Sequence, residues 1–142
     1  MEVVFVAFCY LLWYNIQNES EARPMISKET IELIKRFRDE RNWSQFHNPK
    51  DLAISINLEA SELLEIFQWS GTDLDCKEKI DSVREELADV LCYCILMADR
   101  YGLDLDEIIT EKVAKNEEKY PVEKAYGNKE KYTMLKVKED EI

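Results

Sequence analysis

The sequence predicts an all-α protein, and three of its features support that fold class. Glycine and proline are scarce, with three of each in 142 residues, so few positions suit the tight turns of β-hairpins. Apolar residues recur at helical spacing over several long segments. Two of those segments are joined by a short charged connection, as in an antiparallel helix pair. Together these features favour a single domain built as a four-helix bundle.

The composition narrows the range of partners. Hydrophobic residues make up 46% of the chain and charged residues 35%, which indicates a folded core rather than disorder. The net charge is −11 and basic residues do not cluster, so duplex nucleic acid is not an expected partner. An anionic small molecule would need local cations or a metal ion to bind against this charge.

The chain divides into three parts by composition. Residues 1–24 are atypical, with an apolar run from Val3 to Tyr14 that has the length of a signal peptide but no basic residue before it. Three interpretations remain open: a segment upstream of a start at Met25, which we favour, an extra helix docked on an apolar groove, or a membrane anchor, the least favoured. The domain itself is expected over residues 25–121. Residues 122–142 form a polar tail, expected to be extended or loosely ordered.

The first two helices of the domain are marked by their caps. Ser27 is a suitable N-cap for a helix that ends near Asn42. The segment W-S-Q-F-H-N-P (residues 43–49) is expected to be a loop, and its Asn48 caps the next helix. That second helix is expected from about residue 50 to 69 and is apolar nearly all round, so it should lie at the centre of the bundle.

The third helix is expected from about Glu78 to Tyr101. Its main apolar stripe is predicted to comprise Ile80, Val83, Leu87, Val90, Leu91, Cys94 and Ala98. Gly102 provides a helix stop, and Asp104 begins a fourth helix that ends near Pro121.

Two pairs of carboxylates lie within the most apolar helices. Glu59 and Glu62 form one pair, and Glu86 and Asp89 form the other. A spacing of three residues places both members of a pair on one side of a helix. A lone pair is usually a solvated charged face, but carboxylates in apolar surroundings are normally paired or bound to a metal. Because the two helices should pack antiparallel, we expect the four acids to surround a divalent cation.

The residue types narrow the choice of metal and of reaction. All-oxygen ligands suit Mg²⁺, with Mn²⁺ as an alternative. A ferritin-like di-iron site would need Glu-x-x-His motifs, and the one histidine, His47, belongs to neither pair, which also argues against zinc hydrolase chemistry. Mg²⁺ usually binds together with substrate phosphates, so we expect a nucleoside polyphosphate ligand and hydrolysis of a phosphoanhydride bond. The four cysteines form no C-x-x-C motif, which favours a reducing, cytoplasmic location.

Three motifs resemble those of the MazG-like all-α nucleoside triphosphate pyrophosphohydrolases, and most closely the dCTP pyrophosphatase branch. They are L-E-A-S-E-L-L-E-I-F-Q-W (58–69), E-E-L-A-D-V-L-C-Y (85–93) and K-N-E-E-K-Y-P (115–121). The family motif is Glu-x-x-Glu, a spacer and Glu-x-x-Asp, and the four acids match it residue by residue. With W-S-Q-F-H-N-P included, the resemblance extends from about Ile26 to Thr133.

The resemblance implies an Mg²⁺-dependent enzyme that cleaves a dNTP to dNMP and pyrophosphate in nucleotide-pool house-cleaning. Metal ligands and catalytic residues would be Glu59, Glu62, Glu86 and Asp89. One of them or the neighbouring Glu65 would help to deprotonate the water, unless the metal alone suffices. The nucleotide pocket would be formed by Trp43, Phe46, His47, Trp69, Tyr93, Asn116 and Lys119. Relatives assemble as homodimers or homotetramers with sites completed across subunits, and the same is expected here.

Two points leave the substrate open. Relatives that act on dCTP carry a histidine in the first helix near the base, whereas residues 34–37 of this chain contain none. The preferred nucleotide is therefore predicted only as dCTP or a modified dCTP, with a dUTP-type or phosphoribosyl-ATP-type relative as an alternative. Core packing for Trp69 and a solvated helix end for Lys119 are the competing structural interpretations. A non-catalytic helical module that only binds metal or nucleotide is the alternative from another functional class.

Overall fold

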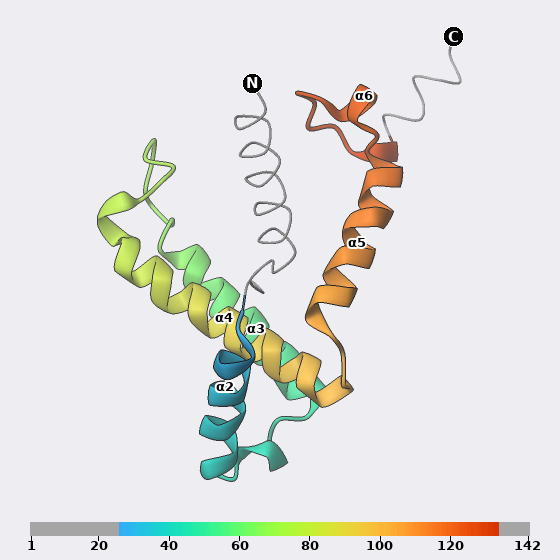
Figure 1. The fold of residues 1–142 in the computed structure, drawn as a ribbon. Helices are drawn as coiled ribbons and strands as arrows, with labels where there is room; N and C mark the ends of the chain where they lie inside the picture. The colour runs from blue at the N-terminus through green and yellow to red at the C-terminus, as the bar shows by residue number, and fades with distance from the viewer. Residues whose placement is uncertain (1–25, 134–142) are drawn as a thin grey trace, which may run out of the picture. The chain divides into compact units, whose positions relative to one another are not determined.

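The computed structural model describes residues 26–133, and within that range it is helical, with five α-helices and no strand (Figure 1). The chain separates into two compact units, residues 1–41 and 42–142, which are described here one at a time. The elements in order are α2 (Lys28–Glu40), η1 (Trp43–Gln45), α3 (Pro49–Glu65), η2 (Lys77–Lys79), α4 (Ile80–Tyr101), α5 (Leu105–Lys119) and α6 (Val122–Ala125). The all-α prediction is confirmed.

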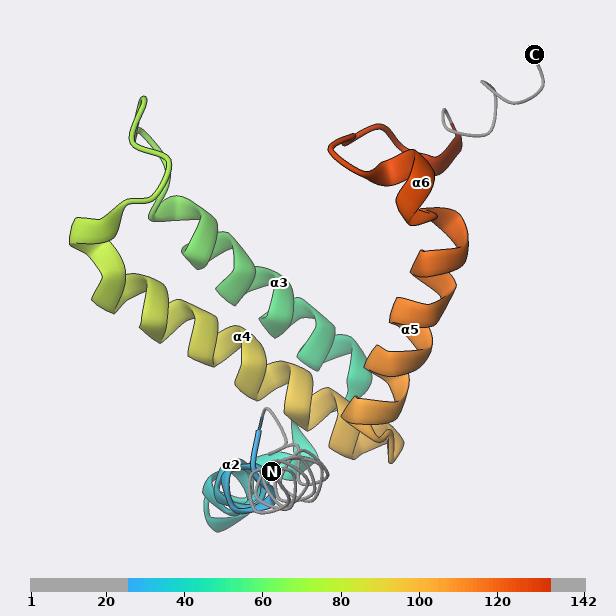
Figure 2. The same cartoon turned by 45° about the horizontal axis from the view of Figure 1, so that its top comes forward.

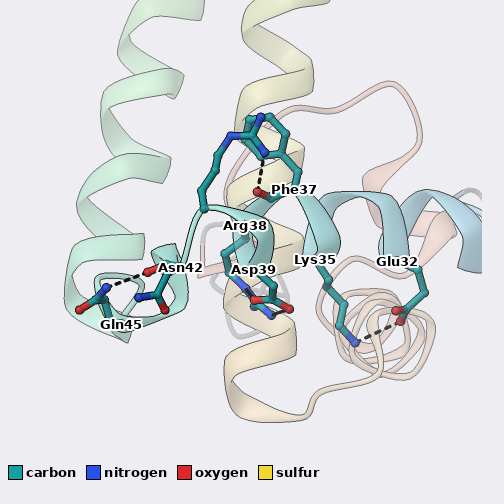
Figure 3. Close-up of polar contacts among 8 residues, drawn as sticks. Glu32, Lys35, Phe37, Arg38, Asp39, Asn42 and Gln45 are labelled. Carbon is teal, nitrogen blue, oxygen red and sulfur yellow. Dashed lines mark hydrogen bonds and ion pairs between the residues drawn. The ribbon is translucent and has the colours of Figure 1, made fainter.

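Helix α2 belongs to the first unit and is stabilised by local interactions. Its N-cap is Ser27, as predicted, and the Ser27 hydroxyl accepts a hydrogen bond from the Thr30 N–H at 3.2 Å. On its surface, Lys35 forms an ion pair with Glu32 at 3.1 Å (Figure 3). Pairs at this spacing contribute only about 0.2–0.5 kcal/mol each.

The second unit begins with a tight turn. Asn42 adopts a left-handed conformation with φ of 54°, which asparagine tolerates better than most residues. The Gln45 side-chain amide donates to the Asn42 carbonyl at 2.9 Å (Figure 3). The segment 43–49, expected to be a loop, therefore contains one short 3₁₀ turn before Asn48 caps α3 as predicted.

Helices α3 and α4 form an antiparallel pair, and they run side by side in both views of the fold (Figures 1 and 2). The predicted pairing of the two most apolar helices is thus confirmed. Helix α3 ends at Glu65, four residues earlier than expected, where the Phe67 and Gln68 N–H groups donate to carbonyls three residues back instead of four. Trp69 then adopts a left-handed backbone with φ of 66°. The fully buried side chains of the described residues are few and comprise Leu52, Cys76, Ile95, Leu96 and Ala98.

The expected apolar stripe of α4 is only partly buried. Its C-terminal end lies in the core, as the charge-free stretch 90–98 predicts. Ile80, Leu87 and Leu91 are exposed instead, so that part of the stripe is a correction to the sequence prediction. The reason is that α3 covers only one side of α4, and periodicity alone does not say which neighbour covers an apolar face.

Helix α4 ends in a left-handed Gly102 with φ of 62°, and Asp104 caps α5 by accepting from the Glu107 N–H at 3.1 Å. Both boundaries were predicted. The tail from residue 122 was expected to be extended or loosely ordered, but its first four residues form the short helix α6. Gly127, with φ of 67°, then reverses the chain so that Tyr132 lies against the end of α5.

No helix within residues 26–133 combines the length and the apolar character needed to cross a bilayer. The interpretations of residues 1–24 and of the last part of the tail concern positions outside the described residues, and they stay predictions.

Candidate active site

Three of the four predicted acids meet between α3 and α4. Glu59 and Glu62 are one helical turn apart on α3, and Glu86 faces them from α4. One carboxylate oxygen from each of the three lies within 4.8 Å of the others. Glu59 and Glu86 are half-buried, whereas Glu62 is exposed. The antiparallel packing of the two helices therefore creates a cluster that neither helix contains alone.

The cluster carries uncompensated negative charge. Within residues 26–133, none of the three carboxylates forms an ion pair with a lysine or arginine. Partial burial, followed by the nearby charges of Glu62, Asp89 and Glu86, raises the pKa of Glu59 above its ordinary 4.5. Partial burial and the charge of Glu62, then those of Asp89 and Glu85, raise the pKa of Glu86 in the same direction. Both shifts show that the neighbouring carboxylates repel one another, and a bound cation would relieve that repulsion.

Asp89 stands at the edge of this cluster. Its side chain is exposed, and its oxygens are not among the three that come within 4.8 Å of one another. Its charge nevertheless contributes to the raised pKa of both Glu59 and Glu86, so it is close enough to act on them. Its assignment as a metal ligand stays a prediction.

The donor set fits a hard divalent cation. Three carboxylates at this separation offer only oxygen ligands, and they leave coordination positions for water or phosphate oxygens. Mg²⁺ has this preference, because it usually keeps several waters and binds through one or two carboxylates plus substrate phosphates. A soft metal that favours thiolate or imidazole would find neither among the three clustered ligands.

Three aromatic side chains predicted for the nucleotide pocket form a second group. His47 follows η1, and its ring lies 6.5 Å from the Trp43 ring and 6.3 Å from the Tyr93 ring. Tyr93 is four residues after Asp89 on α4, so this group and the acids share a side of that helix. The structure therefore brings the rings of Trp43, His47 and Tyr93 together, while their role toward a nucleotide stays a prediction.

Two other predicted aromatic residues are exposed. Phe46 has more than half of its surface exposed, and Trp69 has 90% exposed. The competing interpretation of Trp69 as a core residue therefore does not hold in this chain. A left-handed backbone in a bulky residue costs about 1–3 kcal/mol, so Trp69 is both strained and exposed.

The last two predicted residues are on α5. Asn116 is exposed, and its carbonyl accepts a hydrogen bond from the Tyr120 N–H at 2.8 Å. The Lys119 ammonium lies 5.5 Å from the centre of the Tyr132 ring, within reach of a cation–π interaction. Their roles toward a nucleotide stay predictions.

Two further features were missed in the sequence. Tyr132 contacts both Lys119 and Tyr120, and the glycine at 127 is the only local signal that the tail folds back. An open groove of about 430 Å³ is lined by Ser61, Leu64, Glu65, Phe67 and Gln68 on the outer side of α3. It contains Glu65, the additional candidate for activating water, but none of the three clustered acids.

Comparison with known proteins gives consistent results. The chain is 36% identical to dCTP pyrophosphatase 1 of Mus musculus over 130 residues, which is 84% of this chain and 76% of that protein. It is 36% identical to dCTP pyrophosphatase 1 of Homo sapiens over 75% of this chain and 68% of that protein. A crystal structure of a pyrophosphatase from Archaeoglobus fulgidus matches with a TM-score of 0.63 and 41% identity, covering 66% of this chain and 91% of the other.

The fold and the site together define a class of all-α protein in which two antiparallel helices hold a cluster of carboxylates. The chain belongs to the MazG-like family, which matches residues 54–135, a range that includes all three clustered acids. The predicted family is thereby confirmed.

Proposed function

We propose that this protein is an Mg²⁺-dependent dNTP pyrophosphohydrolase, which converts a dNTP and water to a dNMP and pyrophosphate. The observation that carries the proposal is the meeting of Glu59, Glu62 and Glu86 within 4.8 Å across two helices. The broader class, a nucleotide pyrophosphohydrolase, rests on the family and on relatives named as pyrophosphatases. The preferred substrate is dCTP or a modified dCTP, and the cellular role is removal of unwanted nucleotides.

The acids would hold Mg²⁺, with Mn²⁺ as a possible substitute. Bound there, the cation would neutralise phosphate charge and lower the pKa of a coordinated water. The protein's contribution is to hold three carboxylates on two rigid helices, with little reorganisation needed on binding. In the reaction a water oxygen bonds to phosphorus and the anhydride bond between the α- and β-phosphates breaks. Asp89 or Glu65 would accept the proton if the metal alone does not suffice.

The aromatic group would bind the nucleoside. Rings stack well on any base, with about 1–3 kcal/mol per base as a typical contribution. Trp43, His47 and Tyr93 are joined by ring contacts next to the start of α3. The exposed Trp69 lies beyond the opposite end of this helix, about 25 Å away along its axis, so it would add a face to a site that a second subunit completes. Phe46, Asn116 and Lys119 are assigned to substrate through the family motif. Lys119 would contact phosphate, and Asn116 the sugar or base.

We further propose that the active protein is a homodimer or homotetramer. Large apolar side chains remain exposed on the central helix pair, among them Ile54, Leu58, Leu64, Leu87 and Leu91. Ile54 and Leu58 are one turn apart on α3, and Leu87 and Leu91 are one turn apart on α4, so each pair forms an exposed apolar strip that a partner could cover. A second copy of the chain is the natural cover for these strips, because homo-oligomers bury the same patch on each subunit. Within residues 26–133 the thiols of Cys76, Cys92 and Cys94 are free, which is consistent with the expected cytoplasmic location.

The decisive experiment is pyrophosphate release from a panel of deoxynucleoside triphosphates, each with Mg²⁺ and with EDTA. We expect release only with Mg²⁺, and fastest from dCTP or a modified dCTP. Fastest release from dUTP would favour the dUTP-type alternative. Metal binding without turnover of any nucleotide would favour the non-catalytic module. Release that persists fully in EDTA would overturn the metal-dependent proposal.

A further inference from the structure

Trp69 has a conformation that its own chemistry does not explain. Its backbone is left-handed, with φ of 66°, and its side chain is 90% exposed. A bulky residue disfavours that backbone region, and an exposed indole gains nothing from burial in return. Strained residues of this kind persist where the surrounding structure holds them. A neighbouring side chain should therefore stabilise the left-handed backbone of Trp69.

The end of α3 shows which side chain this is. In a continuing α-helix, the Ser70 N–H would donate to the Ile66 carbonyl, four residues before it. Here the Ser70 N–H donates to the Phe67 carbonyl instead, at 3.2 Å. The Ile66 carbonyl accepts a hydrogen bond from the Lys79 ammonium at 2.9 Å. The change to hydrogen bonds three residues back begins at Phe67, whose N–H donates to the Leu64 carbonyl at 3.1 Å, and Lys79 takes the Ile66 carbonyl to which the Ser70 N–H would donate in a continuing helix.

Lys79 follows a loop whose internal hydrogen bonds hold it near the end of α3. One Asp73 carboxylate oxygen accepts from the Asp75 N–H at 3.1 Å and from the Cys76 N–H at 3.0 Å. Cys76 is buried, and its thiol lies 3.9 Å from the same Ile66 carbonyl. The loop thus contacts the end of α3 through two side chains, the Cys76 thiol and the charged Lys79 ammonium. A cation at a helix C-terminus is also favoured by the helix dipole.

We propose that Lys79 is a positioning residue for nucleotide binding: it caps the end of α3 and so holds Trp69 outward, ready to meet a base bound at a site that a second subunit completes. Lys79 acts through the Ile66 carbonyl and does not itself touch the nucleotide. The binding part of this proposal rests on the proposed function. The structural part, that Lys79 fixes the conformation of Trp69, stands without it.

The chain offers a matched control two residues away. Lys77 lies in the same 3₁₀ turn, but its side chain is 85% exposed and its ammonium meets only the exposed Asp75 carboxylate, at 3.5 Å. Lys77→Met and Lys79→Met remove the same charge from the same turn. Only the second removes a hydrogen bond to the end of α3. Lys79→Arg keeps a charged donor at that position.

The structural part is tested by ¹⁹F NMR of the full chain labelled with 5-fluorotryptophan, with the Trp69 resonance assigned through Trp69→Phe. We expect the Trp69 resonance to move in Lys79→Met toward its position in the urea-unfolded protein, while the Trp43 resonance stays in place. Lys77→Met and Lys79→Arg should leave the Trp69 resonance unchanged. Asp73→Ala, which removes the hydrogen bonds that hold the loop before Lys79, should move the Trp69 resonance in the same direction as Lys79→Met. An unchanged Trp69 resonance in Lys79→Met, or an equal change in Lys77→Met, overturns the proposal.

The binding part is tested by steady-state kinetics with the best substrate of the nucleotide panel. Loss of an ordered stacking face should raise KM in Lys79→Met by about fivefold or more, since a stacked base is worth ~1–3 kcal/mol. The turnover number should stay within about twofold, because the acids are untouched. A fall in kcat with KM unchanged overturns the binding role. If the wild-type protein turns over no nucleotide, the proposed function fails, while the NMR result still decides whether Lys79 positions Trp69.

Discussion

The His47 ring meets the Tyr93 ring edge-on, with 6.3 Å between the ring centres and 65° between the planes. This contact joins the segment after η1 to the middle of α4. Trp43 lies four residues before His47 in the same segment, and its ring centre is 6.5 Å from that of His47. His47 is therefore the link between two aromatic residues that the family motif assigns to the nucleotide, and Tyr93 lies one helical turn beyond Asp89.

The two ring contacts of His47 predict the effect of truncating its side chain. In His47→Ala, Trp43 and Tyr93 lose their common neighbour, so we expect KM for the nucleotide to rise by about fivefold or more while kcat changes less. His47→Phe keeps a ring of similar shape and should recover most of the wild-type KM. The measurement is initial-rate kinetics of pyrophosphate release. Equal KM values for the alanine and phenylalanine variants would remove His47 from the pocket wall.

Removal of one clustered carboxylate should affect metal binding and catalysis together. In Glu62→Gln we expect turnover to fall by roughly 100-fold or more, because metal-assisted hydrolysis depends on several kcal/mol of charge stabilisation. Mg²⁺ should raise the melting temperature of the wild-type protein, since a ligand at 100 times its Kd adds about 2.7 kcal/mol, but not that of Glu62→Gln. Differential scanning fluorimetry with Mg²⁺ and with EDTA measures this.

Asp89→Asn gives a sharper version of the same test, because Asp89 lies outside the three-oxygen cluster. A direct ligand should behave as Glu62 does in both assays. A residue that only acts at a distance should leave Mg²⁺-dependent stabilisation largely intact. Full turnover in both Glu62→Gln and Asp89→Asn would contradict the proposed metal site.

The metal-free protein should show a specific dependence on pH at this site. The pKa values of Glu59 and Glu86 are raised in the folded chain, chiefly by partial burial and then by the neighbouring acids. A raised pKa means that the folded chain binds the proton more tightly than the unfolded chain. The stabilisation is thus present below the ordinary value of 4.5 and is lost as pH rises through the raised values.

The observable is the melting temperature in EDTA from about pH 4.5 upward, compared between the wild-type protein and Glu59→Gln. The wild-type protein should lose stability relative to the variant as pH rises, because only the wild type ionises Glu59. Added Mg²⁺ should reverse the order at the upper end of that range. Parallel melting curves at every pH would show that Glu59 is not under charge repulsion.

Assembly should depend on the exposed apolar surface of α3. Leu64 is 70% exposed and lines the open groove on that helix, so Leu64→Glu should place a charge in the interface and shift the protein toward monomer. Asn57→Glu is the matched control, since it adds the same charge at an exposed polar position of the same helix. Size-exclusion chromatography with light scattering distinguishes the species. A wild-type monomer would contradict the proposed oligomer.

Much of this protein follows from the sequence alone. Helix content, the N-caps Ser27, Asn48 and Asp104 and the stop at Gly102 are local properties, so a few neighbouring residues determine them. The spacing of Glu59 from Glu62 likewise places both on one side of α3 wherever that helix packs. These features require no knowledge of distant contacts, which is why the sequence predicted them.

Only the tertiary structure decided which of these residues meet. Glu86 approaches Glu59 and Glu62 because α3 and α4 pack side by side at one particular register, and Asp89, on the same turn of α4, stays at the edge. The contact at the early end of α3 was not predictable either, because there the Ile66 carbonyl accepts a hydrogen bond from Lys79, thirteen residues further along the chain. Contacts between residues so far apart are set by packing, whereas composition and periodicity report only on local structure.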